Sequence, residues 1–278
     1  MFACKSYIII CIFSIALFTA PSCNEGEDEE YRMEQFKLEA VGAADEAEIF
    51  VHYPLAGKQE PSPAVLICPG GGYSQLFMDS EGHKIAKWFA SQGFVGVVLK
   101  YRFPEGRHTA PLSDAEQAMS TIRRNAALWH IDSGRVGVLG ASAGGHLAAC
   151  LSNLAADANR PDFAILFYPV ISFDNSITHY ATREALLGNE VANSDLIERY
   201  SLEKQVNAKT PPTLLLVCKD DEVVNSQNSI LYYSVLQQQH IPSEIRIFPN
   251  GGHGWGFDEG FSYHQEVKSL IRDWLKMM

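Results

Sequence analysis

Positive charge is scarce in this sequence of 278 residues, in which 22 lysines and arginines stand against 33 aspartates and glutamates. The formal net charge of -11 leaves no basic stripe that could neutralise a row of phosphates, so we expect no nucleic-acid partner. Internal repeats and low-complexity tracts are also missing. Since 46% of the residues are hydrophobic, the composition indicates one globular domain with a large core.

Cysteines with metal-binding or redox spacing are absent too. Three of the six cysteines lie within the first 23 residues, and Cys68, Cys150 and Cys218 sit in apolar surroundings without C-x-x-C spacing. Such cysteines are typical of buried core thiols and not of a disulfide framework or a zinc site. We therefore expect no bound metal.

The apolar stretch near the N-terminus is too short for a membrane span. It runs from Tyr7 to Phe18, whereas a bilayer requires about 20 apolar residues. Lys5 precedes this stretch, and small residues and Pro21 follow it. This pattern favours a signal peptide over residues 1–22, with a transmembrane anchor as the alternative.

Residues 23–34 begin with a cysteine that is followed by a cluster of carboxylates. The segment APSC at residues 20–23 loosely matches a bacterial lipobox, in which the cysteine becomes the lipidated first residue, although Pro21 is unusual there. The carboxylates favour a solvated tether, and a cysteine followed by acidic residues resembles the export signal of surface lipoproteins in Bacteroidetes-type bacteria. We expect an exported lipoprotein, anchored to the outer membrane through Cys23 on its periplasmic or cell-surface face. A plain disordered acidic N-terminus is the alternative.

From residue 35 to residue 278, short β-branched runs alternate with helical patterns, as an α/β domain with a mostly parallel sheet requires. Residues 35–40 and 47–53 alternate apolar and polar side chains, which predicts two leading strands that form an antiparallel edge. Continuous apolar runs predict buried strands over 64–68, 94–99, 135–139, 163–168 and 213–218, with a last strand over 244–248. Helices are predicted over 79–91, 113–129, 142–155, 226–239 and 261–276. The second has N-cap chemistry at Ser113, with Asp114 as a further helix-start residue. The prediction is a central sheet of about eight strands, flanked by helices.

Residues 170–212 form a connection that is too long for a simple crossover and has only weak helical patches. An insertion of this length is usually functional. Because ligands bind at the carboxyl ends of the strands in open α/β sheets, we predict that residues 170–212 form a small cap over those ends.

The segment Gly140-Ala141-Ser142-Ala143-Gly144 lies between a predicted strand and a predicted helix. A G-x-S-x-G sequence in this context is typical of a nucleophile elbow, whose strained turn projects the serine hydroxyl above the sheet. The alternative is a glycine-rich turn that caps an ordinary helix. Partner residues must decide between the two.

A second glycine run, at residues 70–72, ends the first buried strand. Backbone N–H groups without side chains in the way can converge on a developing oxyanion, where each donor contributes roughly 3 to 4 kcal/mol. We expect an oxyanion hole made by Gly71, Gly72 and Ala143. A flexible surface loop is the alternative.

A serine nucleophile needs an imidazole to accept its proton and a carboxylate to orient that imidazole. His253 follows the last predicted strand on a glycine loop, whereas His146, four residues beyond Ser142, is expected to pack or hydrogen-bond beside the nucleophile helix. Asp221 follows a strand and stands between serine and histidine in chain order. Asp220 remains the alternative acid.

Several motifs in the sequence together resemble those of the α/β-hydrolase esterases that include bacterial xylan O-acetyl esterases and feruloyl esterases. These esterases are similar to dienelactone hydrolases and lipases. The motifs are PGGGY, DSEG, KYR, LSDAEQAM, WHIDSGRVGVLGASAGGHLA and GGHGWGF. The likeness covers nearly all of residues 45–278. It departs from the related hormone-sensitive-lipase pattern at Pro69, which stands where that family has a histidine before the glycines.

The resemblance implies a serine esterase that needs no cofactor and acts on acetyl or feruloyl esters of plant polysaccharide, with a small ester or an acylated oligosaccharide as its partner. Tyr73 and Trp255 adjoin the proposed site and are expected to stack on a sugar or feruloyl ring, although packing is the alternative for both. Two other functions stay open. They are an exported serine peptidase of prolyl-oligopeptidase type and a catalytically silent glycan-binding lipoprotein. The sequence does not indicate an oligomeric state.

Overall fold

The computed structural model describes residues 31–38, 46–54 and 60–278. The predicted signal peptide, Cys23 and residues 23–30 of the predicted tether therefore lie outside the described residues. Within the described ranges, no helix combines the length and apolar character that a membrane span needs.

One sheet runs through the domain, and its described part has eight strands in the order β1-β2-β4-β3-β5-β6-β7-β8. Strands β1 and β2 pair antiparallel, as do β2 and β4, and all other neighbours pair in parallel. The strands are β1 (Tyr31–Lys37), β2 (Glu48–Pro54), β3 (Ser62–Cys68), β4 (Val95–Lys100), β5 (Ile131–Ala141), β6 (Ala164–Phe167), β7 (Thr213–Cys218) and β8 (Ser243–Phe248). The predicted mostly parallel sheet with an antiparallel edge is confirmed.

The N-terminal boundary of the domain differs from the prediction. Strand β1 starts at Tyr31, so the last four residues of the predicted tether belong to the sheet. The charged side chains of this segment are tolerated because β1 is an edge strand, where Arg32 and Glu34 form an ion pair in solvent. Acidic composition was therefore a poor guide to the point where the sheet begins.

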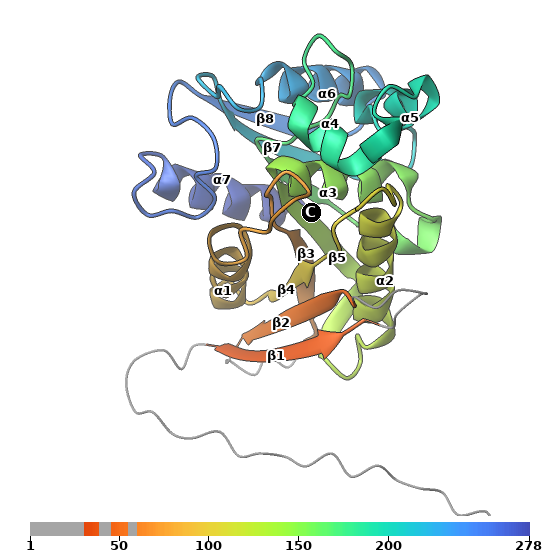
Figure 1. The fold of residues 1–278 in the computed structure, drawn as a ribbon. Coiled ribbons are helices and arrows are strands. Elements are labelled where there is room, and N and C mark those ends of the chain that lie inside the picture. Colours follow the sequence, from red (N-terminus) through yellow and green to blue (C-terminus); the bar gives the residue numbers. More distant parts are fainter. Residues whose placement is uncertain (1–30, 39–45, 55–59) are drawn as a thin grey trace, which may run out of the picture.

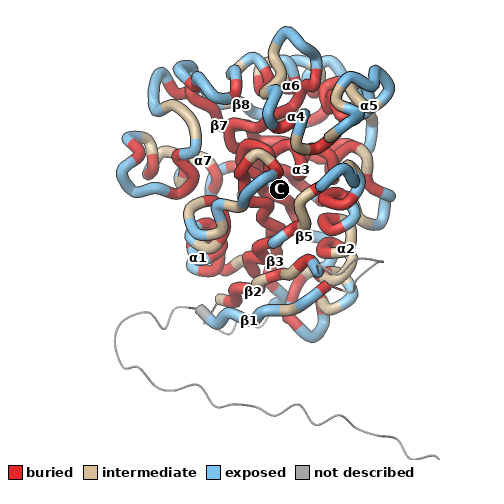
Figure 2. Tube along the Cα trace, viewed as in Figure 1, coloured by how far each residue is buried: buried red, intermediate tan, exposed pale blue. Residues whose placement is uncertain are grey.

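Helices cover both faces of the sheet (Figure 1). Helices α1 (Lys84–Ser91) and α7 (His264–Met277) pack on one face, and α2 (Ala110–Arg124), α3 (Ser142–Leu154) and α6 (Gln227–Gln238) pack on the other. Figure 2 shows the central strands as buried. Strand β3 is buried at every position, as its continuous apolar run predicts, and the free thiols of Cys68, Cys150 and Cys218 are buried.

Helix α2 begins and ends earlier than predicted. It starts at Ala110, with Pro111 in its first turn, and ends at Arg124. Ser113 is therefore inside the helix and is not its N-cap. Asp114, predicted to serve the helix start, is only 1% exposed and accepts hydrogen bonds from the side chain and backbone N–H of Arg102. A buried carboxylate needs such a partner, and the sequence spacing does not reveal it.

The connection from β6 to β7 folds as short helices, namely α4 (Tyr180–Leu187), η3 (Gly188–Glu190), α5 (Ser194–Arg199) and η4 (Leu202–Lys204). The η4 turn contacts α3 and α6, which fixes this segment to the body of the domain. A further short π-helical turn, η1 (Asp79–His83), leads into α1. Both connections border the cavity described below.

Candidate active site

Ser142 lies at the junction between β5 and α3. Its φ angle is +54°, a left-handed conformation that L-residues adopt at an energetic cost. Gly144 faces Cys68 closely, since a Cβ atom added there would stand 2.1 Å from the Cys68 carbonyl oxygen. The strand-to-helix turn therefore has the strained, tightly packed geometry of a nucleophile elbow.

The structure brings Ser142, His253 and Asp221 into one hydrogen-bonded chain. His253 Nε2 lies 2.9 Å from Ser142 Oγ, and His253 Nδ1 lies 2.7 Å from Asp221 Oδ2. The Asp221 side chain is fully buried, and its other oxygen, Oδ1, accepts the backbone N–H groups of Val223 and Val224 at 2.9 Å each. A carboxylate held in this way orients the imidazole with Nε2 toward the serine hydroxyl.

Asp220, the alternative acid, has a different position. Its carboxylate accepts the backbone N–H groups of Gly252 at 2.9 Å and Gly251 at 3.1 Å. These bonds, that from Gly252 first, hold the pKa of Asp220 below its ordinary value. Asp220 thus supports the loop that carries His253, while Asp221 contacts the imidazole itself.

The glycine run after β3 lies beside the elbow. A Cβ atom on Gly70 would stand 3.0 Å from the Cβ of Ser142, and Gly71 and Gly72 line the same cavity as Ser142. Ala143 is the second residue of α3, where the backbone N–H has no intrahelical acceptor. The three predicted donors therefore flank the serine, whereas the N–H of Gly70 is taken up by the carboxylate of Glu81 at 2.8 Å.

His146 is fully buried and packs beside α3. Its ring stacks on Phe173, Nε2 donates to the Tyr200 carbonyl at 3.0 Å, and Nδ1 lies 3.0 Å from the Tyr73 hydroxyl. Burial lowers the pKa of His146 to about 4. The predicted structural role of this histidine matches its contacts.

Tyr73 and Trp255 are not placed to stack on a ligand. Tyr73 is 2% exposed, and Trp255 is 5% exposed and lies flat against Phe261 with ring centroids 4.6 Å apart. Neither residue lines the cavity around Ser142. Both aromatic rings serve packing, so the expected substrate contact is wrong for each.

A cavity of about 650 Å³ opens above Ser142 and His253. One wall comes from the glycine loop and η1, and the other from α4 of the predicted cap and from Val223. Phe77, at 48% exposed, is the large aromatic side chain in this lining. The lining residues are Gly71, Gly72, Ser74, Gln75, Phe77, Ser80, Glu81, Ser142, His179, Ala181, Glu184, Ala185, Val223, His253 and Gly254.

Sequence reasoning missed Glu81, a buried glutamate in the floor of this cavity, and its partner Tyr168. The Tyr168 hydroxyl donates to Glu81 Oε1 at 2.7 Å. Glu81 stands within the DSEG motif, but no spacing links that motif to the glycine run or to the end of β6. Only the fold brings them together.

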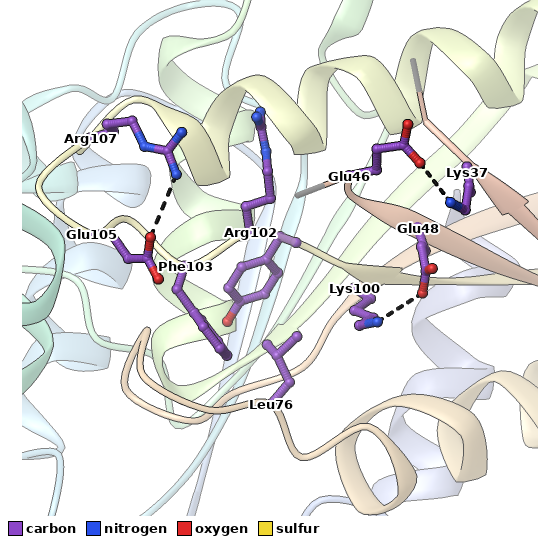
Figure 3. A pocket seen from close by; sticks show the side chains of 10 residues that line it. Lys37, Glu46, Glu48, Leu76, Lys100, Arg102, Phe103, Glu105 and Arg107 are labelled. Carbon is purple, nitrogen blue, oxygen red and sulfur yellow. Dashed lines mark hydrogen bonds and ion pairs between the residues drawn. The ribbon is translucent and has the colours of Figure 1, made fainter. Parts of the chain in front are cut away.

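A second cavity, of about 420 Å³, has Leu76, four residues after Gly72, in its lining (Figure 3). Most of its charged side chains pair with one another, as in the ion pair between Lys100 and Glu48 at 2.9 Å, whereas Arg102 pairs with Asp114 outside the lining. Over the described residues, no group of three or more His, Cys, Asp or Glu side chains could hold a metal ion. Ser142 and His253 line the cavity above the elbow and do not line this second one.

Comparisons with known proteins agree with this geometry. The family model BD-FAE matches residues 51–236. The chain is 38% identical over 216 residues to an acetylxylan esterase of Xylanibacter ruminicola, covering 77% of this chain and 45% of that protein. It is 34% identical over 205 residues to endo-1,4-beta-xylanase B of Butyrivibrio fibrisolvens, covering 68% of this chain and 32% of that protein. The chain thus spans less than half the length of these two relatives.

Solved structures show the same architecture. An acetyl ester-xyloside bifunctional hydrolase from Caldicellulosiruptor lactoaceticus superposes with a TM-score of 0.78 at 32% identity, covering 84% of this chain and 89% of that one. A sugar hydrolase from Lactococcus lactis superposes with a TM-score of 0.72 at 29% identity, covering 88% and 98%. The resemblance to xylan esterases that the motifs carry is confirmed, and the chain is an α/β hydrolase that belongs to the BD-FAE family.

Proposed function

We propose that this protein is a serine esterase that removes acyl groups, acetyl groups foremost, from plant polysaccharide. The observation that carries the proposal is the chain of hydrogen bonds from Ser142 Oγ through His253 to Asp221, at 2.9 Å and 2.7 Å. The similarity to an acetylxylan esterase supports the same chemistry. No comparable observation favours the peptidase or the silent binding protein.

The reaction proceeds through an acyl-enzyme. Ser142 Oγ attacks the ester carbonyl while its proton passes to His253 Nε2, and the N–H groups of Gly71, Gly72 and Ala143 stabilise the oxyanion. The imidazolium then protonates the departing sugar oxygen. Water, deprotonated by the same nitrogen, attacks the acyl-enzyme and releases the acid. Asp221 keeps the proton of the resting imidazole on Nδ1.

The cavity suits an ester carried on a ring. At about 650 Å³ it has room for more than an acetyl group, and the exposed ring of Phe77 offers an apolar face to a sugar or an aryl acid. The activities for which the relatives are named, acetylxylan esterase and acetyl ester-xyloside hydrolase, make acetylated xylan the first substrate to test. Feruloylated oligosaccharides are the second.

The test compares Ser142→Ala with a matched serine. Ser142→Ala should lower ester turnover by roughly three or more orders of magnitude, since the nucleophile is lost while substrate binding persists. Ser152→Ala is the control, because Ser152 lies on the same helix, is 1% exposed and donates only to the Ala148 carbonyl. Acetate release from acetylated xylan, ferulate release and labelling by a fluorophosphonate are measured. Full activity of Ser142→Ala, or unlabelled wild-type protein, would sink the proposal.

Export and lipid attachment at Cys23 are also proposed. The apolar leader, the cysteine and the carboxylates after it support this proposal, and a polymeric substrate outside the cell agrees with it. Mass spectrometry of the mature N-terminus and fractionation of a Cys23→Ser variant are the tests. Equal partition of wild type and variant into the soluble fraction would contradict lipidation.

A further inference from the structure

A buried carboxylate joins the two loops that flank Ser142. Glu81 is 2% exposed in the floor of the cavity, and its two oxygens have different partners. Oε2 accepts the backbone N–H of Gly70 at 2.8 Å, and Oε1 accepts the hydroxyl of Tyr168 at 2.7 Å. The first bond reaches the loop of the oxyanion donors.

The second bond continues to the loop that carries His253. The oxygen of the Tyr168 hydroxyl accepts the backbone N–H of Gly256 at 2.8 Å, and the Tyr168 ring lies 4.6 Å, between centroids, from the ring of His253. Tyr168 directly follows β6 with a φ of +34°, a strained conformation for a tyrosine. Strain of this kind persists only where surrounding contacts enforce it.

Both loops also pack directly against residues 80 and 81. A Cβ atom on Gly70 would stand 2.5 Å from Glu81 Oε2, and one on Gly256 would stand 2.8 Å from the Ser80 carbonyl oxygen and 3.2 Å from Glu81 Cγ. The N–H of Phe257 donates to the same Ser80 carbonyl at 3.2 Å. Residues 80 and 81 therefore support both loops, and the close packing leaves neither loop room to shift.

Glu81 is a carboxylate buried away from water. A carboxylate buried without need is costly, and desolvation raises the pKa of Glu81 against the opposing effect of its bonds from Tyr168 and Gly70. In addition, the bond to Glu81 occupies the N–H of Gly70. The next two amides, those of Gly71 and Gly72, are the ones left beside the serine.

We infer that Glu81 is a positioning residue, which through Tyr168 holds the oxyanion donors and the His253 imidazole in mutual register on either side of Ser142. This inference rests on the proposed esterase function. It assigns to Glu81 no contact with the reacting atoms. Loss of the Glu81 carboxylate should therefore weaken the stabilisation of the transition state more than it weakens the binding of substrate.

The experiment uses Glu81→Gln, Tyr168→Phe and the double variant. Glutamine has the shape of glutamate but only one acceptor oxygen, so it cannot accept both Gly70 and Tyr168. Phenylalanine keeps the ring against His253 and removes both hydroxyl bonds. Glu203→Gln is the control. Glu203 is also buried, at 7% exposed, and its carboxylate accepts a hydrogen bond from the Ser172 hydroxyl at 2.8 Å, but it does not line the cavity.

The concentration of active sites is first determined by titration to completion with a fluorophosphonate. We then expect kcat on nitrophenyl acetate, expressed per active site, to fall roughly tenfold to a hundredfold in Glu81→Gln, while KM changes less than about threefold. The affinity for a trifluoromethyl ketone, which forms an oxyanion on Ser142, should fall by the same factor as kcat. Tyr168→Phe should lose activity as well, and the double variant should be no worse than Glu81→Gln, because both changes break one link.

Three results would overturn the inference. They are unchanged kcat and ketone affinity in Glu81→Gln, an equal loss in Glu203→Gln, or fully additive losses in the double variant. If Glu81→Gln does not fold, Tyr168→Phe alone decides by the same two readouts. An inactive wild-type chain would remove the esterase proposal itself, whereas an active wild type with an active Glu81→Gln would remove only the role of Glu81.

Discussion

The two oxygens of the Asp221 carboxylate have separate tasks. Oδ1 accepts two backbone N–H groups, which fix the carboxylate in place, and Oδ2 remains for His253. The Asp220 carboxylate instead accepts the backbone N–H groups of Gly251 and Gly252, in the loop that carries His253. The neighbouring aspartates thus differ in their contacts, because one is buried against the imidazole and the other faces solvent.

Asp221→Asn and Asp220→Asn form a matched pair. Asparagine at 221 can present an N–H to His253 and so favours the wrong tautomer, which should lower kcat by roughly a thousandfold to ten-thousandfold. Asp220→Asn should have a much smaller effect, since one oxygen still accepts from the loop. Steady-state rates on nitrophenyl acetate measure both. A larger loss in Asp220→Asn would reassign the acid.

Single residues mark where sequence reasoning succeeds and fails. Ser142 and His253 stand in motifs whose backbone requirements are local, so chain order was enough to pair them. Tyr73 directly follows the glycine run at residues 70–72, and Trp255 stands two residues after His253, but both are buried in the core. Phe77, four residues beyond Tyr73, has the exposed ring. The direction of a side chain depends on loop backbone angles, which no residue pattern specifies.

The elbow depends on how closely β3 approaches the start of α3. The carbonyl oxygens of Cys68 and Pro69 would stand 2.1 Å and 2.4 Å from a Cβ atom on Gly144. Since both contacts are with backbone, relief requires a shift of strand or helix. The glycine is therefore needed for space at this position.

Gly144→Ala should destabilise the protein by about 1 to 3 kcal/mol, as overpacking of a rigid site does. It should also lower activity, because the elbow must move. Gly134→Ala, in strand β5 that leads into the elbow, is the control, since the nearest atom to a Cβ added there would be Asp132 Oδ1 at an ordinary 3.5 Å. Urea unfolding measures both variants. Equal stability of the two would contradict the argument from close approach.

At the level of elements, strand identity was predictable because buried parallel strands need continuous apolar runs, as in β3 and β7. Helix boundaries were less predictable from the sequence. The start of α2 was misplaced because Ser113 followed by Asp114 suggested a cap, whereas the actual partner of Asp114, Arg102, lies 12 residues earlier. A tertiary ion pair and a helix cap draw on the same residue types, so composition alone does not separate them.

In the part of the chain that the structure describes, burial lowers the pKa of His52 and of His146 to about 4. An unfolded histidine titrates near pH 6.5, so below that pH the unfolded chain binds protons that the folded chain does not. The stabilising contribution of these neutral imidazoles is complete above about pH 6.5. It is lost progressively as the pH falls toward about 4.

The free energy of unfolding should therefore fall by about 1.5 kcal/mol for each of these histidines between pH 6.5 and pH 5. Burial raises the pKa of Glu81 and Glu203, which acts in the opposite sense. Urea unfolding at both pH values gives the sum, and the ring carbon shifts of His146 isolate one contribution. Protonation of His146 in the folded protein near pH 6 would refute this account.

Strand direction finally determines which way the catalytic machinery faces relative to the proposed anchor. Strand β1 runs parallel to β4, because both pair antiparallel with β2, and Tyr31 therefore stands at the amino ends of the parallel strands. Ser142 lies at their carboxyl ends. With the proposed anchor before Tyr31 and the proposed polysaccharide substrate, the cavity would lie at the strand ends opposite the point of attachment, so that a long fibre could reach it without approaching the lipid surface.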